Sequence, residues 1–362
     1  MRQACCAEIK LSALRHNAQV VRKKVPHAKI AAVVKADAYG HGVKSVVAAL
    51  ENDIDLFAVA YLEEALALRS TTRQPILVLE GYFDQQELEA AAQNNIACVV
   101  HSAYQLALLE NFPPARNMNL WLKVDTGMNR LGFSQAEFQD VYSLLSEGIK
   151  PRSLTLMSHL SCADKLESDI CTAQITAFNQ LVSDKGKAVS LANSAGIMAW
   201  PSATTDQHPQ WVRPGVMLYG CSPFSHSTGE QEGLQAALTL RSTVIGLREV
   251  QAGESVGYGA TWRAERPTRI GVVAIGYGDG YPRHAKVGTP VLVNGQRVPL
   301  VGRVSMDMIT VDLSDIEGVE IGSSVILWGE GLPAEEVASH ADTISYELLT
   351  GITERVSRRV VG

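Results

Sequence analysis

The strongest constraint on the fold is an alternation of short apolar runs and amphipathic segments that repeats eight times between residues 8 and 222. The apolar runs are residues 30–35, 57–60, 76–80, 97–100, 120–124, 154–159, 189–192 and 212–219. The segments between them, such as GVKSVVAALEN and QQELEAAAQN, carry apolar side chains every three or four positions, as a helix with one buried face does. Alternating strands and helices are typical of a parallel sheet. Eight such units predict an α/β chain that begins with a (β/α)8 TIM-like barrel.

The pattern changes after Ser222, where the polar, turn-rich stretch PFSHSTGEQEG is followed by β-branched residues punctuated by glycine. We therefore predict two domains: a barrel at residues 1–222, whose first residues could pair with the second domain, and a mostly β domain at residues 223–362. In the second domain, Asn294-Gly295 separates two apolar runs and predicts a two-residue hairpin turn, because both central residues need positive φ. Residues 334–361 are predicted to be helical and irregular.

Composition excludes several classes of protein. Hydrophobic residues make up 46% of the 362 residues and charged residues 19%, which is typical of a packed globular protein and not of a disordered chain. The net charge is −6 and no long run of lysine and arginine occurs, so we do not expect nucleic acid as a partner. No segment approaches the roughly 20 apolar residues of a membrane-spanning helix. Residues 1–17 contain no apolar signal core, and we expect a cytoplasmic protein without a membrane partner.

The six cysteines predict neither a metal site nor a disulfide framework. They are Cys5, Cys6, Cys98, Cys162, Cys171 and Cys221, with no CxxC pair and no histidine at zinc-ligand spacing nearby. We expect most of them to be reduced and buried as small apolar side chains.

Polar residues that end the apolar runs are the first candidates for function, because barrels of this type carry their sites at the carboxyl ends of the strands. Lys35 ends the first run and is followed by Tyr39, Gly40, His41 and Gly42. An amine partly removed from water loses its proton more readily and can then attack a carbonyl group to form an imine. The alternative is a lysine that only extends its charged end into solvent.

Other strand ends are also polar. They supply Lys123, Asp125 and Arg130, then His159 and Asp164, then Asn193 and Ser194, and finally Arg213 and Tyr219. Taken singly, these residues are compatible with structural ion pairs. Taken together, they predict an anion-binding mouth, in which the backbone N–H groups near Ser194 and Gly215 could approach a phosphate.

Six motifs in the same order give the chain a resemblance to the alanine racemase family, which uses pyridoxal phosphate. They are AVVKADAYGHG (32–42), KVDTGMNRLGF (123–133), VRPGVMLYG (212–220), VGYGATW (256–262), GYGDGYPR (276–283) and GRVSMDM (302–308). The resemblance covers nearly the whole chain. It implies racemisation of alanine and, as the expected role, supply of D-alanine for peptidoglycan.

The resemblance also implies the two bases. Lys35 matches the lysine that binds pyridoxal phosphate as an imine and acts on D-alanine, and Tyr258 matches the opposing base, which acts on L-alanine from the partner subunit. Two bases on opposite faces are needed because inversion removes a proton from one face of a planar carbon and returns it to the other. A homodimer with shared active sites is therefore implied. Without the resemblance, Tyr258 would be an ordinary aromatic residue of a strand.

Several further roles follow from matching positions. Arg213 matches the arginine that faces the pyridine nitrogen, where a permanent cation keeps that nitrogen unprotonated. His159 matches its hydrogen-bonding partner, and Arg130 a residue near the cofactor phenolate and the substrate carboxylate. Lys123 matches a position that is often carbamylated. The remaining matches are the phosphate ligands Tyr39, Ser194, Gly215, Val216 and Tyr346, the substrate-carboxylate contact Met306, and the entry-corridor residues Asp164, Tyr277 and Arg283.

Three other functions stay open. A decarboxylase of basic amino acids shares a similar cofactor barrel, but it would be expected to place a carboxylate where Arg213 stands. Noncatalytic proteins that bind pyridoxal phosphate lack a counterpart of residues 223–362. A cofactor-free aldolase could also use Lys35. Within racemases, serine or another small amino acid is an alternative substrate.

Overall fold

The structure is a computed structural model that describes residues 5–362. Its contacts divide the chain into two compact units, each interrupted in sequence. We call residues 15–38 and 46–218 the barrel unit, and residues up to 14 together with 39–45 and 219–362 the β unit. The strand β1 near the N-terminus belongs to the β unit, in which it pairs with β10 and β18.

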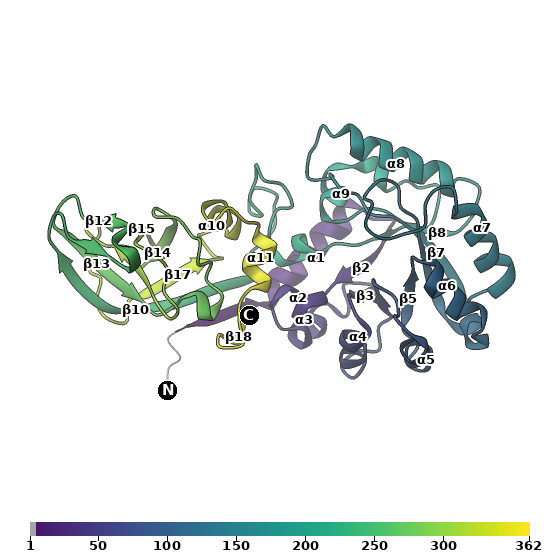
Figure 1. Ribbon diagram of the computed structural model, residues 1–362, viewed down its shortest axis with the longest axis horizontal. Coiled ribbons are helices and arrows are strands. Elements are labelled where there is room, and N and C mark those ends of the chain that lie inside the picture. The colour runs from purple at the N-terminus through teal and green to yellow at the C-terminus, as the bar shows by residue number, and fades with distance from the viewer. Residues whose placement is uncertain (1–4) are drawn as a thin grey trace. The chain divides into compact units, whose positions relative to one another are not determined.

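Eight parallel strands form the centre of the barrel unit, and their carboxyl ends position the candidate site (Figure 1). Along the sheet they are ordered β8-β7-β6-β5-β4-β3-β2-β9, and a bridge between Val189 and Gln210 nearly closes the ring. The strands are β2 (Lys29–Val33), β3 (Leu56–Val59), β4 (Ile76–Val78), β5 (Ala97–Val100), β6 (Asn119–Lys123), β7 (Ser153–Met157), β8 (Ala188–Ser190) and β9 (Trp211–Val212). The predicted fold class, a (β/α)8 barrel followed by a mostly β domain, is confirmed.

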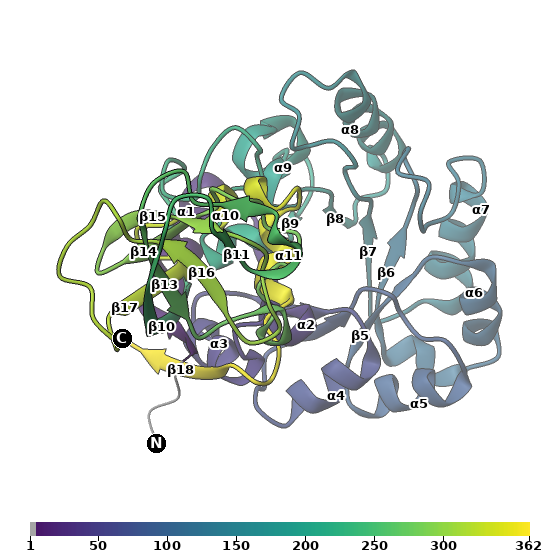
Figure 2. The same cartoon turned by 60° about the vertical axis from the view of Figure 1, so that its left-hand side comes forward.

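Every residue of β3, β4 and β5 is buried, as expected for parallel strands covered on both faces. Helices lie outside the strands (Figure 2). These are α3 (Val43–Leu50), α4 (Leu62–Arg69), α5 (Gln85–Gln93), α6 (Ala103–Glu110), α7 (Phe138–Ser143), α8 (Asp169–Val182) and α9 (Ser194–Ala199), with α1 (Leu11–Lys24) preceding the first barrel strand. Short helices of other types are η1 (Pro113–Asn117), η2 (Leu144–Ile149), η3 (Pro201–Ala203) and η4 (Val216–Tyr219).

Side-chain caps fix where four of these helices begin. Asp84, Ser102, Ser168 and Asn193 each accept a hydrogen bond from the backbone N–H three residues later, at the starts of α5, α6, α8 and α9. Such caps satisfy N–H groups that a helix leaves unpaired at its first turn. Asn193 stands three residues after β8, so its cap also fixes the start of α9 at the candidate residue Ser194.

The β unit contains an eight-stranded sheet ordered β13-β16-β15-β14-β17-β10-β1-β18. The long strand β10 also pairs with β13, which closes six of these strands into a ring. The strands are β1 (Cys6–Lys10), β10 (Leu238–Val250), β13 (Thr268–Val273), β14 (Pro290–Val293), β15 (Gln296–Val301), β16 (Ile309–Asp312), β17 (Ser324–Trp328) and β18 (Ser357–Val361). A second sheet pairs β11 (Ser255–Val256) with β12 (Trp262–Arg263), and the helical segments are α10 (Ala334–His340), α11 (Ser345–Thr350), η5 (Tyr258–Ala260) and η6 (Tyr277–Asp279).

The predicted hairpin is confirmed. Val293 pairs with Gln296 across the turn, and Asn294 and Gly295 have φ of 49° and 80°. Two other predictions were wrong in part. Of the run 212–219, only Val212 lies in a strand, β9 (Trp211–Val212), because Pro214 and Gly215 interrupt the run and η4 follows. The tail is not helical to its end, because Ser357–Val361 is a strand that pairs in parallel with β1.

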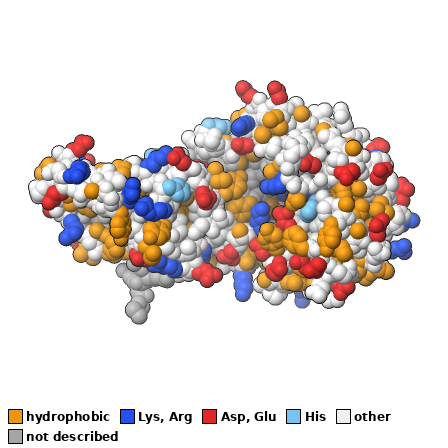
Figure 3. Space-filling view, in the orientation of Figure 1, with side chains coloured by type: hydrophobic (Ala, Val, Ile, Leu, Met, Phe, Trp, Pro, Cys, Tyr) orange, Lys and Arg blue, Asp and Glu red, His pale blue; other side chains and the backbone are white. Residues whose placement is uncertain are grey.

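All six cysteines are free thiols, but only Cys98, Cys171 and Cys221 are buried. In the described part of the chain, no helix has the length and apolar character needed to span a bilayer. Residues 5–362 also contain no group of three or more histidine, cysteine, aspartate or glutamate side chains arranged to hold a metal ion. Side chains of both charges are interspersed on the face shown in Figure 3.

Candidate active site

Lys35 follows β2 at the carboxyl end of the barrel strands and begins α2 (Lys35–Tyr39). This segment is a left-handed turn and not an ordinary helix, since Ala36, Asp37, Ala38 and Tyr39 have φ between 52° and 54°. Residues with a Cβ atom rarely adopt this conformation. The sequence contains no glycine in this run, and the turn was not predicted.

Arg213 is a buried charged residue, and only 4% of it is exposed. Its Nη1 donates to Ser190 Oγ (2.6 Å), and its Nη2 donates to the carbonyl oxygen of Ser158 (2.6 Å). Burial lowers the pKa of the guanidinium to about 10, so it remains charged at neutral pH. The chain thus fixes a permanent cation between β7, β8 and β9.

His159 lies against this cation, with Nδ1 3.2 Å from Arg213 Nη2. Because arginine only donates hydrogen bonds, Nδ1 must accept, and the ring proton belongs on Nε2. Burial and then the charge of Arg213 lower the pKa of His159 well below its ordinary value, and Lys123, Arg130 and Lys35 act in the same direction. His159 is therefore neutral at physiological pH.

Lys123 ends β6 and is also buried. Burial, followed by the charge of Arg213, lowers its pKa from 10.5 to about 8, while Glu80 and Asp125 oppose this shift. Arg130 belongs to the loop that leaves and rejoins this strand, since Asp125 N donates to the carbonyl oxygen of Phe133 and Phe133 N donates to that of Lys123. Lys35, Lys123, Arg130 and Arg213 therefore form a basic cluster around His159.

Ser194 begins α9 and lies next to the loop that follows β9. Its Oγ accepts hydrogen bonds from the backbone N–H groups of Gly215 (2.9 Å) and Met217 (3.4 Å). A hydroxyl group that accepts twice still has its own proton to donate. Together with the basic cluster, this donor set fits a ligand that carries phosphate and other anionic groups.

The remaining predicted site residues fall into two places. Asp164 is exposed in the barrel unit, on the loop between β7 and α8, and Val216 is buried at the start of η4. The others belong to the β unit. There the rings of Tyr39 and Tyr346 lie 6.0 Å apart, and the chain brings the loops of Tyr277 and Met306 together, since Gly278 N donates to the carbonyl oxygen of Met306. Arg283 and Tyr258 are exposed, the latter to 68%.

Sequence reasoning missed the side chains that hold these loops. Gln174, on the buried face of α8, accepts from Ser161 N and donates to the carbonyl oxygen of His159. Ser190 holds Arg213, as described above. The available signal was a polar residue at a core position of an amphipathic helix, because a buried amide requires hydrogen-bonding partners.

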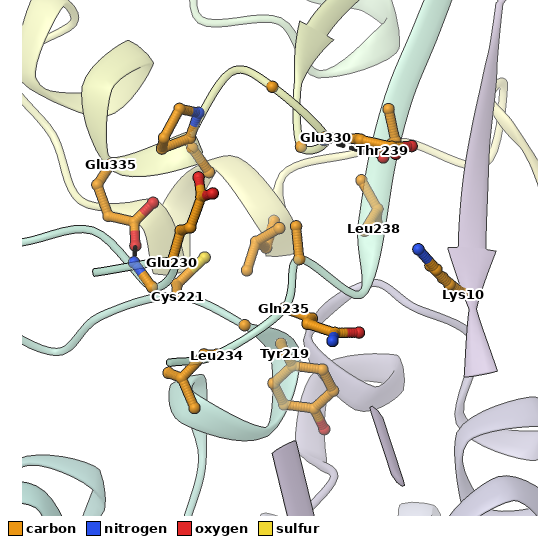
Figure 4. Close-up of a pocket in the computed structure, with 18 residues that line it drawn as sticks. Lys10, Tyr219, Cys221, Glu230, Leu234, Gln235, Leu238, Thr239, Glu330 and Glu335 are labelled. Atoms are coloured by element: carbon orange, nitrogen blue, oxygen red, sulfur yellow. Dashed lines mark hydrogen bonds between the residues drawn. The ribbon is translucent and has the colours of Figure 1, made fainter. Parts of the chain in front are cut away.

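A pocket of about 270 Å³ in the β unit is not this site (Figure 4). Its wall includes Lys10, Cys221, Glu230 and Glu335. Tyr219, one of the polar strand-end residues named from the sequence, also lines it, but Lys35, Arg213 and Tyr258 do not. Glu335 accepts hydrogen bonds from the backbone N–H groups of Ser222 and Gly229, so its carboxylate fixes the surrounding loops.

Comparison with known proteins gives a family match over both parts of the chain. The model of the alanine racemase N-terminal domain matches residues 9–223, and that of the C-terminal domain matches residues 237–360. The catabolic alanine racemase of Pseudomonas putida is 47% identical over 357 residues, which cover 98% of each chain. The crystal structure of the biosynthetic alanine racemase from Pseudomonas aeruginosa has a TM-score of 0.96 at 45% identity, covering 99% of this chain and 100% of the other. The crystal structure of alanine racemase from Bartonella henselae with covalently bound pyridoxal phosphate has a TM-score of 0.88 at 30% identity. The match covers 99% of this chain and 100% of the other. The chain therefore belongs to the alanine racemase family.

Proposed function

We propose that this chain interconverts L-alanine and D-alanine with pyridoxal phosphate bound to Lys35. The observation that carries the proposal is the match to the alanine racemase family over both domains, with Lys35 standing at the end of a barrel strand beside a basic cluster. When bound, pyridoxal phosphate withdraws electrons from the α-carbon of the substrate, which makes loss of its proton easier.

Lys35 and Tyr258 are the proposed bases. The amine of Lys35 takes or returns the proton on one face of the α-carbon, and the phenol of the partner subunit's Tyr258 does so on the other. A proton that leaves one face and is replaced on the opposite face inverts the centre. Tyr258→Phe removes only the proton-carrying oxygen, so we expect a loss of about 10²-fold or more in both directions of racemisation.

Arg213 is proposed to face the pyridine nitrogen of the cofactor. It is charged, and its side chain is fixed by hydrogen bonds to Ser190 and Ser158. A guanidinium has no acceptor, so it disfavours a proton on that nitrogen. A weaker electron sink shortens the lifetime of the carbanion and thereby limits side reactions. Its neutral partner His159 holds the guanidinium in place without adding a second charge.

The other proposed contacts divide between cofactor and substrate. Tyr39, Ser194, Gly215, Val216 and Tyr346 would hold the phosphate, and the tyrosine hydroxyls and the Ser194 hydroxyl are suitable donors. Arg130 would bind near the substrate carboxylate, where a guanidinium can donate two parallel hydrogen bonds. The Met306 N–H of the partner would complete that contact, and Asp164, Tyr277 and Arg283 would line the entry corridor.

We propose a homodimer with shared sites. Tyr258, Tyr277, Met306 and Met308 in the β unit are 40–68% exposed, and exposed apolar side chains that form one patch mark an interaction surface. A proton-transfer site also needs to exclude water. A second copy of the chain would supply that cover. In this proposal, the domain predicted at residues 1–222 binds the cofactor, and the domain predicted at residues 223–362 completes the partner's site.

Lys123 is proposed to be carbamylated. Carbon dioxide adds to a neutral amine, and the lowered pKa of about 8 leaves an appreciable neutral fraction at physiological pH. The resulting carbamate is an anion that can orient Arg130 and offset the positive charge of the basic cluster. Peptide mass measured after chemical trapping in bicarbonate should show the adduct on Lys123, and an unmodified amine under these conditions would refute it.

The test of the activity is a chiral assay of both alanine enantiomers, with and without added pyridoxal phosphate, in deuterated water. We expect both enantiomers to racemise with deuterium entering at the α-carbon. Release of carbon dioxide from a basic amino acid as the main reaction would overturn the proposal. We further propose a cytoplasmic role in supplying D-alanine to peptidoglycan, which predicts that the gene restores growth of a D-alanine auxotroph.

A further inference from the structure

Glu64 joins two loops of the barrel unit through a single carboxylate. It lies in the first turn of α4, where Oε2 accepts hydrogen bonds from the backbone N–H groups of Ala60 (2.8 Å) and Tyr61 (3.3 Å). Its other oxygen, Oε1, accepts from the backbone N–H of Ala36 (2.7 Å). Ala36 is the residue that follows Lys35, so this carboxylate ties the start of α4 to the chain next to the proposed cofactor lysine.

The segment that Glu64 holds is conformationally strained. Ala36, Asp37, Ala38 and Tyr39 have positive φ, although none of them is glycine. Each such residue is less stable in this region than in a right-handed conformation, so a run of them persists only where its surroundings hold it. Ala38 N donates to the carbonyl oxygen of Val34 (2.9 Å), and Glu64 anchors the N–H at the beginning of the run.

Helix capping explains only half of this arrangement. A glutamate at the third position of a helix commonly accepts from the N–H of the capping residue, as Oε2 of Glu64 does at Tyr61. Capping gives no reason for Oε1 to accept from Ala36, which comes from a different loop 28 residues earlier. A carboxylate is suited to both tasks, because each of its two oxygens accepts hydrogen bonds, whereas an amide offers one oxygen and one donor group.

We propose that Glu64 is a positioning residue for Lys35, which it serves by holding the left-handed turn that begins at Ala36. This inference rests on the proposed function, in which Lys35 binds pyridoxal phosphate. With the turn released, the Lys35 amine would spend less time within the basic cluster around His159. Both attachment of the cofactor and proton transfer by Lys35 would then become less efficient.

The experiment compares Glu64→Gln with Glu63→Gln in the purified full-length enzyme. Glu63 lies in the same first turn of α4 and is exposed, so its replacement removes the same charge from the same helix end. The readout independent of turnover is the fraction of Lys35 captured by pyridoxal phosphate after borohydride reduction, measured by peptide mass spectrometry as the cofactor concentration is raised. Racemisation kcat/KM is measured on the same samples.

We expect Glu64→Gln to need about tenfold more cofactor for half-maximal capture and to lose about tenfold in kcat/KM, the effect of one charge-assisted hydrogen bond. Glu63→Gln should match the unmodified enzyme in both. Equal behaviour of the two variants would overturn the proposal. Glu64→Asp keeps the charge but is one methylene too short to reach both loops. If Glu64→Gln does not fold, Glu64→Asp replaces it, and the same losses of about tenfold in cofactor capture and kcat/KM are expected.

A second comparison separates positioning from capping. Glycine adopts positive φ without the steric penalty that alanine pays, so Ala36→Gly should reduce the dependence of the turn on Glu64. The loss caused by Glu64→Gln should therefore shrink in the Ala36→Gly background. An undiminished loss would assign Glu64 to capping alone. Absence of capture at Lys35 in the unmodified enzyme would instead refute the cofactor assignment, and with it this role.

Discussion

The two groups of proposed site residues differ in how the chain holds them. In the barrel unit, Arg213 is buried and donates a short hydrogen bond to the carbonyl oxygen of Ser158, His159 lies 3.2 Å from it, and Lys123 is also buried. In the β unit, Tyr258 and Met306 are largely exposed. The first group is held in place within a single chain, whereas in the proposed dimer a second copy of the chain would cover the second group. Changes in the first group should therefore alter cofactor binding and stability, and changes in the second should alter turnover through assembly.

The largest effect should come from Lys35→Ala, which removes both the point of cofactor attachment and one base. We expect racemisation to fall by about 10³-fold or more, with no cofactor captured covalently at this position. The chiral assay and peptide mass spectrometry after borohydride reduction check this. Racemisation close to the normal rate would show that another group holds the cofactor.

Ser190→Ala tests the rigidity of the barrel group. It leaves the buried Nη1 of Arg213 and the carbonyl oxygen of Trp211 without the hydroxyl that now serves both. A lost hydrogen bond to a buried charge should lower the free energy of unfolding by about 2 kcal/mol, measured by urea denaturation. The matched control is Ser202→Ala at an exposed position, expected to change stability by less than about 0.5 kcal/mol. If Ser190→Ala and Ser202→Ala both changed the free energy of unfolding by the same small amount, the hydrogen bond from Arg213 to Ser190 would not stabilise the barrel unit.

Lys123 should make stability depend on pH in a definite direction. Its pKa is about 8 in the folded chain and 10.5 ordinarily, so between these values the unfolded chain binds more protons. The free energy of unfolding should therefore rise with pH across this window, by at most about 1.4 kcal/mol per pH unit. Below pH 8, the folded chain bears the full cost of burying a charged amine. In Lys123→Met this rise should disappear. Urea denaturation in bicarbonate-free buffer measures it, and identical pH profiles for the two proteins would contradict the burial of an unmodified amine.

The smallest effect is expected from Gly295→Ala, in a hairpin of the β unit away from any proposed site residue. Gly295 has φ of 80°, and no atom lies within 4 Å of the position that a Cβ would occupy. The change should cost about 1 kcal/mol of stability through backbone strain alone and leave kcat/KM unchanged. A loss of activity would show that the β unit transmits strain to the site.

The sequence was most informative where the structural signal is local. Eight apolar runs predicted the eight barrel strands, and Asn294-Gly295 predicted the hairpin. It was least informative where the cause lies far away in the chain. Strand β18 forms because β1 offers it an edge, and its own residues Ser357, Arg358 and Arg359 give little β signal. The left-handed turn after Lys35 contains no glycine, and its anchor Glu64 is an ordinary helix-start residue in the sequence.

For the site, motifs and strand ends indicated the residues that would touch a ligand. They did not indicate the residues that hold those groups, because Gln174 and Glu64 bind backbone atoms of other elements and Ser190 binds the side chain of Arg213. A polar residue at a core position, such as Gln174, indicates that a partner exists, but which atom it binds depends on how the fold brings the loops together. The exposure of Tyr258 is likewise a property of the folded chain that no local pattern reveals.

The most direct test of shared sites is complementation between two inactive variants, Lys35→Ala and Tyr258→Phe. In a mixed dimer, one site combines both changes and the other combines an intact Lys35 with the partner's intact Tyr258. After unfolding and refolding together, random pairing of equal amounts should restore about one quarter of the unmodified activity. If the two variants remain inactive after mixing while each refolds to a dimer, the two bases do not come from different chains and the account is wrong.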